Sequence, residues 1–327
     1  MLRLLRLFLA AFWQTLKRRR TRGPARPSWS FSFECVVAFL RLDWEESSTW
    51  PLPRVRAVTD ARPIPQDQVK KTATRDGTLA GLRTRWFVPP GARDDGALLF
   101  FHGGSYAFGS AWTTHADVIA RLALASGVTA IAVDYRLAPE DPFPAAHEDA
   151  ITAFDALVAD GMKADRIVVG GDSAGGNLAL ELQLALRDRG GPQAKGALLL
   201  SPWADLEMPG ASFLDNDPYD FGDRKTLVAQ AKAYAGEVPL SDPRLSPVNA
   251  SFAGLAPAFV SAGECEIPRD DILRLAARMK DDGVDVTLDV APDMPHDPAV
   301  FAQYHPNGEA ALQAAARWIK AQLPAPR

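Results

Sequence analysis

The segment RIVVGGDSAGGNLAL, from Arg166 to Leu180, joins an apolar strand pattern directly to a helix pattern. The run Ile167–Val169 is typical of a buried strand, and a helix pattern starts by Asn177. A structural turn needs one or two glycines, whereas this turn places four around the single hydroxyl of Ser173: Gly170, Gly171, Gly175 and Gly176. The crowding predicts a tight strand–turn–helix unit that presents Ser173.

Strand and helix patterns alternate over most of the chain. Apolar strand patterns include GALLFF (96–101), VTAIAVDY (128–135), GALLLS (196–201), PAFVSAG (257–263) and VDVTLDV (284–290). Helix patterns separate them, which is typical of a parallel sheet covered on both faces. We therefore expect an α/β fold with a mostly parallel central sheet of about eight strands.

Three further stretches carry local expectations. VKKTAT (69–74) and LAGLRTRWFV (79–88) are interpreted as two strands joined by a turn at Asp76-Gly77. FECVVAFLRL (33–42) is typical of a helix, and the proline-punctuated stretch 50–67 is interpreted as a connection.

The alternation divides the chain into four parts. Residues 1–68 hold a basic N-terminal helix, a linker and part of a cap. Residues 69–204 form the first part of the core, 205–247 form an irregular, partly helical insertion, and 248–327 form the second part of the core. The N-terminal part and the insertion are expected to build the cap together.

Charge is distributed unevenly along the 327 residues. The net charge is −4 and the sequence pI about 5.8, which argues against a nucleic-acid-binding protein of the basic kind. Residues 1–33 carry eight Lys and Arg and no Asp or Glu, and subtracting this +8 from −4 leaves −12 for residues 34–327. An acidic body therefore carries a basic N-terminal segment.

The first segment, MLRLLRLFLAAFWQTLKRRR, is apolar along one helical face. Its uninterrupted apolar run, Leu7–Trp13, is much shorter than the ~20 residues of a membrane-spanning helix. Two interpretations stay open: peripheral membrane contact through residues 1–20, or packing on the protein itself. A cytoplasmic protein is expected, either free or peripheral at a membrane surface.

The two cysteines, Cys35 and Cys265, lack the paired spacing of a zinc or redox motif. Two free thiols are favoured over a long-range disulfide. No metal site and no cofactor-binding motif is expected.

Ser173 lies in Gly171-Asp172-Ser173-Ala174-Gly175, a G-x-S-x-G sequence at a strand-to-helix turn. This context favours a nucleophile over a purely structural glycine turn. In α/β-hydrolases the acid and then the histidine follow the serine along the chain. Of the histidines after Ser173, His296 follows the last strand pattern and is preferred as the base, whereas His305 is expected in a surface turn.

The acid should follow the strand pattern 257–263, in the sequence GECEIPRDD. Glu266 is the choice because it lies in the loop just past the strand, while Asp270 is expected at the start of the next helix and is the alternative. The oxyanion hole is assigned to the amide groups of Gly103, Gly104 and Ala174. His102 is expected to support the loop. Arg136 and Glu140 are expected to pair or to cap within the proline-pinned loop 134–146.

Several motifs occur together in one order: HGGSY (102–106), DYRLAPEDPFPAA (134–146), GDSAGGN (171–177), SPW (201–203), GECEIPRDD (263–271) and MPH (294–296). Together they resemble the hormone-sensitive-lipase-like esterases, a branch of the α/β-hydrolases. The loop departs from the common HGGG at Ser105, and the acid is Glu266 where many members have Asp.

The resemblance implies an α/β-hydrolase fold with a helical cap, and a serine carboxylesterase that acts on small or medium acyl esters without a cofactor. It implies Ser173, Glu266 and His296 as the triad, and a homodimer by family likeness. A lactone hydrolase, an acetyl-ester deacetylase, a surface-acting lipase and a non-catalytic ligand-binding receptor remain alternatives. With an unperturbed histidine, activity should fall as pH drops through ~6.5.

Overall fold

The central element is an eight-stranded sheet in the order β1-β2-β4-β3-β5-β6-β7-β8. The computed structural model describes residues 2–62 and 65–323. The strands are β1 (Ala73–Leu79), β2 (Leu82–Val88), β3 (Ala97–Phe101), β4 (Thr129–Val133), β5 (Ile167–Asp172), β6 (Gly196–Leu200), β7 (Ala258–Gly263) and β8 (Val286–Ala291). Strand β2 pairs antiparallel with β1 and β4, and the other pairs are parallel. The expected fold class is confirmed.

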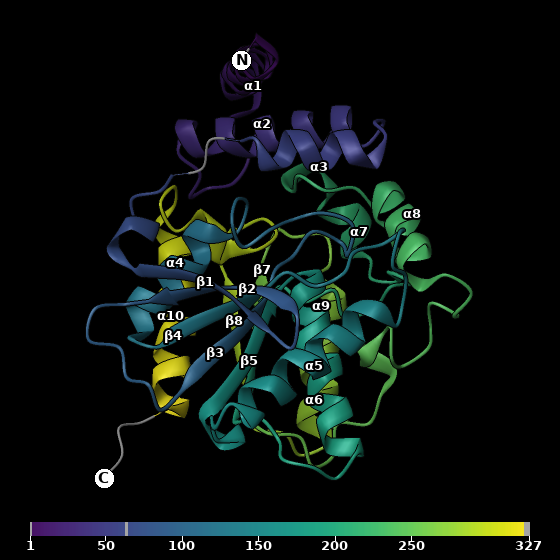
Figure 1. Ribbon diagram of the computed structural model, residues 1–327. Helices are drawn as coiled ribbons and strands as arrows, with labels where there is room; N and C mark the ends of the chain where they lie inside the picture. Colours follow the sequence, from purple (N-terminus) through teal and green to yellow (C-terminus); the bar gives the residue numbers. More distant parts are fainter. Residues whose placement is uncertain (1, 63–64, 324–327) are drawn as a thin grey trace.

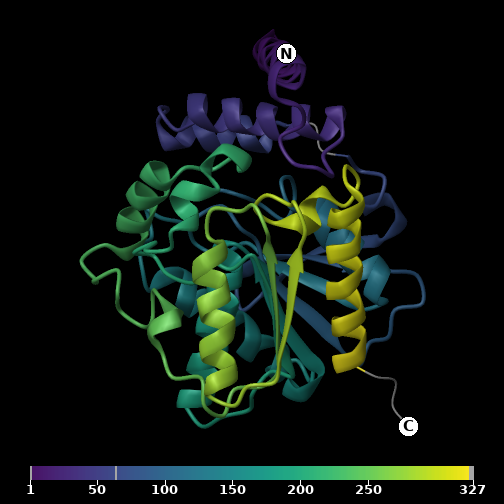
Figure 2. The same ribbon diagram turned by 180° about the vertical axis from the view of Figure 1, so that it is seen from behind.

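Helices cover both faces of the sheet, and further helices lie over one end of it (Figures 1 and 2). They are α1 (Leu2–Arg22), α2 (Phe31–Ser47), α3 (Leu52–Asp60), α4 (Ala116–Ser126), α5 (Ala145–Ala159), α6 (Ala174–Asp188), α7 (Ser212–Asp215), α8 (Arg224–Ala235), α9 (Arg269–Asp281) and α10 (Pro306–Gln322). Helices α5, α6 and α9 contribute to one buried apolar cluster and α4 and α10 to another. The sheet is therefore buried on both faces, as its continuous apolar strands require.

Helices α1 to α3 and α7 and α8 form a layer over the end of the sheet to which β7 and β8 point (Figures 1 and 2). We call this layer, residues 2–62 and 205–247, the cap. Its N-terminal part is anchored by aromatic packing, since the Phe33 ring lies 5.4 Å from that of Phe301 in an edge-on arrangement. In the described parts of the chain, 2–62 and 65–323, no helix is long and apolar enough to cross a bilayer.

Two local predictions are wrong. The β1–β2 turn falls at Ala80-Gly81, both with positive φ, while Asp76 and Gly77 lie inside the ladder opposite Arg85 and Thr84. Left-handed conformations at both central positions match the twist of a two-residue hairpin, which outweighs the Asp-Gly signal.

The second error is α3, which forms where a proline-punctuated connection was expected. Pro51 precedes the helix and Pro53 occupies its first turn, where the missing N–H has no intrahelical partner to lose. The prolines therefore mark the start of a helix.

Candidate active site

Ser173 occupies a strained turn between β5 and α6. Its backbone has φ 52° and ψ −117°, outside the regions that L-residues favour. A Cβ at Gly171 or Gly175 would overlap the carbonyl oxygen of Phe101, so both positions need glycine. The Ser173 amide donates to the Leu200 carbonyl at 2.8 Å, which ties the turn to β6. This is the strand–turn–helix unit that the sequence predicts.

Glu266 and His296 meet above the ends of β7 and β8. The Oε2 atom of Glu266 lies 2.7 Å from Nδ1 of His296, and Oε1 accepts the Gly263 amide at 2.8 Å. The Glu266 side chain is fully buried. Asp270 instead binds Arg269 at 2.9 Å and accepts the Ser212 amide. The structure thus brings Glu266, and not Asp270, to the histidine.

The surroundings of His296 favour its protonated form. Burial lowers the pKa, but the hydrogen bond and charge of Glu266, together with the charges of Asp220 and Asp297, raise it to about 9. The value expected for an unperturbed histidine is therefore too low. The same carboxylate that orients the ring also stabilises the imidazolium that forms when the ring accepts a proton.

Asp220 is a site residue that the sequence analysis missed. It belongs to the cap and is buried, and Oδ2 accepts the Ile267 amide at 2.8 Å while Oδ1 accepts the His296 amide at 3.1 Å. Burial raises the pKa of Asp220. One cap side chain thus joins the loop of Glu266 to the loop of His296. An aspartate within an irregular insertion gives no sequence signal for such a role.

The loop after β3 provides the candidate oxyanion donors, with one correction to the predicted set. The Gly103 amide donates to Oδ2 of the buried Asp172 at 3.0 Å. This bond occupies its one proton, which argues against Gly103 as an oxyanion donor. Gly104, with φ 117°, and the following Ser105 line the cavity, and Ala174 begins α6, where the first amides have no intrahelical acceptor.

Asp172 has two further charged or polar neighbours. His115 places Nε2 3.0 Å from Oδ2, and although burial opposes ionisation, His115 holds the pKa of Asp172 below its ordinary value. Burial and the charge of Asp172 raise the pKa of nearby Asp297 well above its ordinary value. The pKa values of these two buried carboxyl groups are therefore shifted in opposite directions, that of Asp172 downwards and that of Asp297 upwards.

His102 and His305 support the structure around the site. His102 is buried and stacks on Tyr135 with ring centroids 4.5 Å apart, and burial lowers its pKa to about 4. It is thus neutral and supports its loop. His305 is also buried, contrary to the surface turn expected. It begins α10, where Nδ1 accepts the Asn307 amide at 3.1 Å, and Nε2 lies 3.2 Å from the Ser28 carbonyl.

The predicted pairing of Arg136 with Glu140 is wrong. Arg136 pairs with Asp149 of α5 at 2.8 Å. Glu140 pairs with Arg56 of α3, also at 2.8 Å. The proline-pinned loop is thus tied to the core on one side and to the cap on the other, a long-range arrangement that the local sequence does not encode.

Ser173 and His296 line one cavity of about 1150 Å³ that also reaches Gly104 and Ser105. Its walls come mainly from the cap and are largely aromatic and aliphatic: Phe8, Val36, Phe39, Leu40, Trp44, Leu52, Val55, Phe213, Phe221 and Leu227. Ser173 and His296 supply polar groups to the same cavity. This combination is typical of a site that holds an apolar molecule by its body and a polar group by fixed donors.

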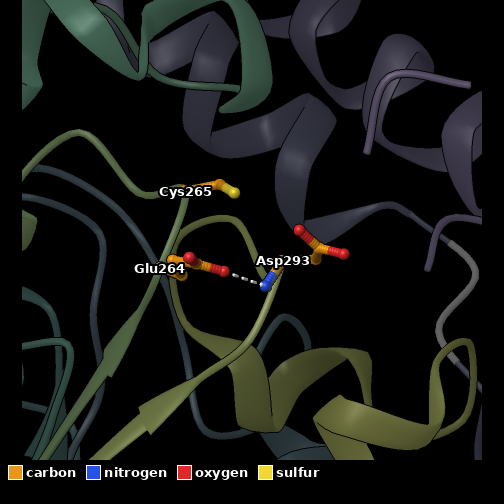
Figure 3. Close-up of side chains that lie close together, drawn as sticks. All are labelled: Glu264, Cys265 and Asp293. Carbon is orange, nitrogen blue, oxygen red and sulfur yellow. Dashed lines mark hydrogen bonds between the residues drawn. The ribbon is translucent and has the colours of Figure 1, made fainter. Parts of the chain in front are cut away.

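One cluster among residues 2–62 and 65–323 has the spacing of metal ligands: Glu264, Cys265 and Asp293 (Figure 3). Arg26 already pairs with both carboxylates of this cluster: its Nε lies 2.8 Å from Asp293, and another guanidinium nitrogen lies 3.5 Å from Glu264. Burial raises the pKa of the Cys265 thiol to about 12, which disfavours the thiolate that a metal needs. The cluster instead anchors the cap linker beside the catalytic loops. Cys35 and Cys265 are both free, as favoured.

Comparison with known proteins gives one consistent class. A family model described as the alpha/beta hydrolase fold matches residues 98–300. An acetyl-hydrolase of Streptomyces hygroscopicus is 35% identical over 249 residues, which cover 75% of this chain and 82% of that protein. An ethyl acetate hydrolase of Pseudomonas putida is 34% identical over 306 residues, covering 88% and 90%.

A crystal structure of an esterase from the bacterial hormone-sensitive lipase family is similar throughout. It matches with a TM-score of 0.83 and 34% identity, covering 90% of this chain and 99% of that one. The chain therefore belongs to the α/β-hydrolase fold family, in its hormone-sensitive-lipase-like esterase branch. It is a carboxylic ester hydrolase.

Replacing Glu266 by Gln removes a charge that raises the pKa of His296, so the pH midpoint of kcat/KM should move to lower pH. In the unmodified enzyme kcat/KM should rise towards pH 9, because a protonated His296 cannot accept a proton. The variant should also lose on the order of 10³–10⁴-fold in kcat. A pH series with a p-nitrophenyl ester measures both, and an unchanged midpoint would contradict the pairing. Asp270→Asn is the matched control, with the midpoint retained.

Asp220→Asn replaces one of the two acceptor oxygens with an NH2 group. One of the two backbone amides would then face a second donor and lose its hydrogen bond. The loops of Glu266 and His296 should then shift, and kcat should fall by up to about 100-fold. Because the charge of Asp220 also raises the pKa of His296, the midpoint should move to lower pH, less than for Glu266→Gln. Asp217→Asn changes a half-buried residue of the same segment that pairs with Arg41, and it should leave the pH midpoint unchanged. Loss of thermal stability with an unaltered pH profile would assign Asp220 a structural role only.

Proposed function

We propose that the chain hydrolyses short- to medium-chain acyl esters through an acyl-enzyme formed on Ser173. The observation that carries this proposal is the cavity, which is lined both by Ser173 on its strained turn and by His296 bound to a buried Glu266. A hydroxyl becomes a nucleophile at neutral pH when an adjacent base removes its proton. The site contains both groups and the carboxylate that orients the base.

In the first half-reaction, Nε2 of His296 takes the Ser173 hydroxyl proton as Oγ bonds to the ester carbonyl carbon. The carbonyl π electrons move onto oxygen, and Glu266 stabilises the imidazolium through Nδ1. When the oxyanion collapses, the bond to the alcohol oxygen breaks and His296 gives its proton to the departing alcohol. Water then takes the place of the alcohol, and its oxygen bonds to the acyl carbon as His296 takes its proton. The bond from that carbon to Oγ breaks, His296 returns the proton to Oγ, and the carboxylic acid leaves.

The oxyanion is held by the amides of Gly104, Ser105 and Ala174 in this proposal. Gly103 serves as a positioning residue, because its amide bond to Asp172 fixes the start of the loop. The left-handed backbone of Gly104 and Ser105 supports this arrangement, since it allows successive amides to face one side. Each such donor contributes about 10²–10³-fold in rate in known enzymes.

The substrate class follows from the cavity walls and the relatives. The relatives named acetyl-hydrolase and ethyl acetate hydrolase support a small ester. The cavity of about 1150 Å³ has room for a longer apolar chain, and each buried methylene contributes about 0.8 kcal/mol. We therefore place the preferred acyl chain between the acetyl group and medium length.

Ser173→Ala should abolish turnover of p-nitrophenyl acetate, with residual activity at least about 10³-fold below the unmodified enzyme. The fold should persist, because the alanine side chain is smaller and the backbone bonds of the turn remain. Circular dichroism and a steady-state assay measure the two effects, and Ser241→Ala on the surface is the control. Retained turnover, or failure of an organophosphate to label Ser173, would exclude the mechanism.

For the acyl chain, p-nitrophenyl esters from acetyl to palmitoyl should show kcat/KM rising at first and falling for the longest chains. Leu40→Trp should shift the optimum to shorter chains, since Leu40 lines the cavity and the indole reduces its volume. Leu214→Trp, on an exposed α7 position, should leave the profile unchanged. A monotonic rise to palmitoyl in the unmodified enzyme would contradict the assignment.

A further inference from the structure

Helix α1 has two apolar faces, and only one of them is covered. Leu7, Ala11 and Thr15 are buried and follow a four-residue spacing along one face. The packing partner on this side is α2, and Figure 1 shows α1 beyond α2 at the far end of the cap. The contact of this face with α2 is the packing on the protein itself that the sequence analysis left open.

The opposite face is exposed to solvent and apolar. Leu2, Leu5, Leu9 and Trp13 follow one another at three- and four-residue spacing and are 85%, 54%, 48% and 62% exposed. Phe8 at the edge of this face is 52% exposed. Of the eight large hydrophobic side chains that are exposed in residues 2–62 and 65–323, these are five. Such a concentration marks an interaction surface.

The charge of α1 is one-sided. The helix carries seven Lys and Arg and no Asp or Glu. Arg3 and Arg6 pair with Asp43 and Glu46 of α2, and Arg18 and Arg19 pair with Glu34.

Three cations of α1 are exposed: Lys17 and Arg20, which continue the apolar face at helical spacing, and Arg22 at the end of the helix. Among the described residues no carboxylate pairs with them. These cations are therefore available to contact anionic groups of a partner.

We propose that the uncovered face of α1 docks on an anionic lipid surface. Leucines and a tryptophan would enter the boundary between headgroups and acyl chains, and the cations at the end of α1 would contact lipid phosphates. A second copy of the chain is a poorer occupant, because a symmetric pair of α1 helices supplies no carboxylate to these cations. A lipid surface supplies both the apolar phase and the negative charge.

The docked orientation also connects the lipid phase to the active site. Phe8 both borders the exposed face and lines the cavity that holds Ser173. The cavity mouth would therefore lie near the surface, where an ester can enter without passing through water. Docking itself goes beyond the proposed function, whereas this route of substrate entry rests on the proposed function.

Sedimentation with vesicles tests the docking. The full chain should sediment with vesicles of phosphatidylcholine containing about 30% phosphatidylglycerol, and at least about tenfold less with phosphatidylcholine alone. High salt should release it, because the contacts with headgroups are screened. Leu9→Ser/Trp13→Ser and Lys17→Ser/Arg20→Ser should each weaken binding at least about tenfold.

Matched controls separate the face from general hydrophobicity and from catalysis. Leu214→Ser/Val290→Ser removes two exposed apolar side chains elsewhere and should sediment like the unmodified chain. Ser173→Ala should also sediment like the unmodified chain. Vesicle binding is therefore measured independently of hydrolysis, even if the proposed function fails. Both α1 variants should retain turnover of soluble p-nitrophenyl acetate.

Two results would overturn the proposal. One is an unmodified chain that stays in the supernatant with anionic vesicles. The other is unchanged sedimentation of the Leu9→Ser/Trp13→Ser variant. If light scattering also shows a dimer that this variant converts to a monomer, a second copy covers the face instead.

Discussion

The rest of the site depends on the backbone strain at Ser173. A residue with φ 52° between a buried strand and a helix persists only where the surrounding packing leaves it no alternative. Here the carbonyl of Phe101 lies so close that Gly171 and Gly175 cannot carry a Cβ, and the Leu200 carbonyl holds the Ser173 amide at 2.8 Å. The sheet thus fixes Ser173, the nucleophile of the proposed mechanism, in one position.

Cap and core together position Glu266 and His296. Asp220 of the cap accepts amide hydrogens from the loops that carry Glu266 and His296. Arg26, in the linker between α1 and α2, pairs with Asp293, three residues before His296. The cap therefore lines the cavity and also contacts the loops that carry Glu266 and His296.

Electrostatics divides the buried carboxyl groups by role. Glu266 contacts His296 and raises its pKa, Asp172 accepts the Gly103 amide, and burial together with the charge of Asp172 raises the pKa of Asp297. Groups of the same type thus have pKa values shifted in different directions, because burial and partners differ from one position to the next.

The sequence alone determined the alternating sheet, the position of Ser173 on its glycine-rich turn, and the two strand-end loops that carry Glu266 and His296. These features depend on periodicity and on backbone sterics within a few residues, which sequence patterns record. Tertiary structure decided between Glu266 and Asp270, engaged Gly103 with Asp172, and brought in Asp220 from the cap. It also left one face of α1 uncovered. Such choices depend on which distant segments meet in space, and residues far apart in the chain leave no local pattern of their contact.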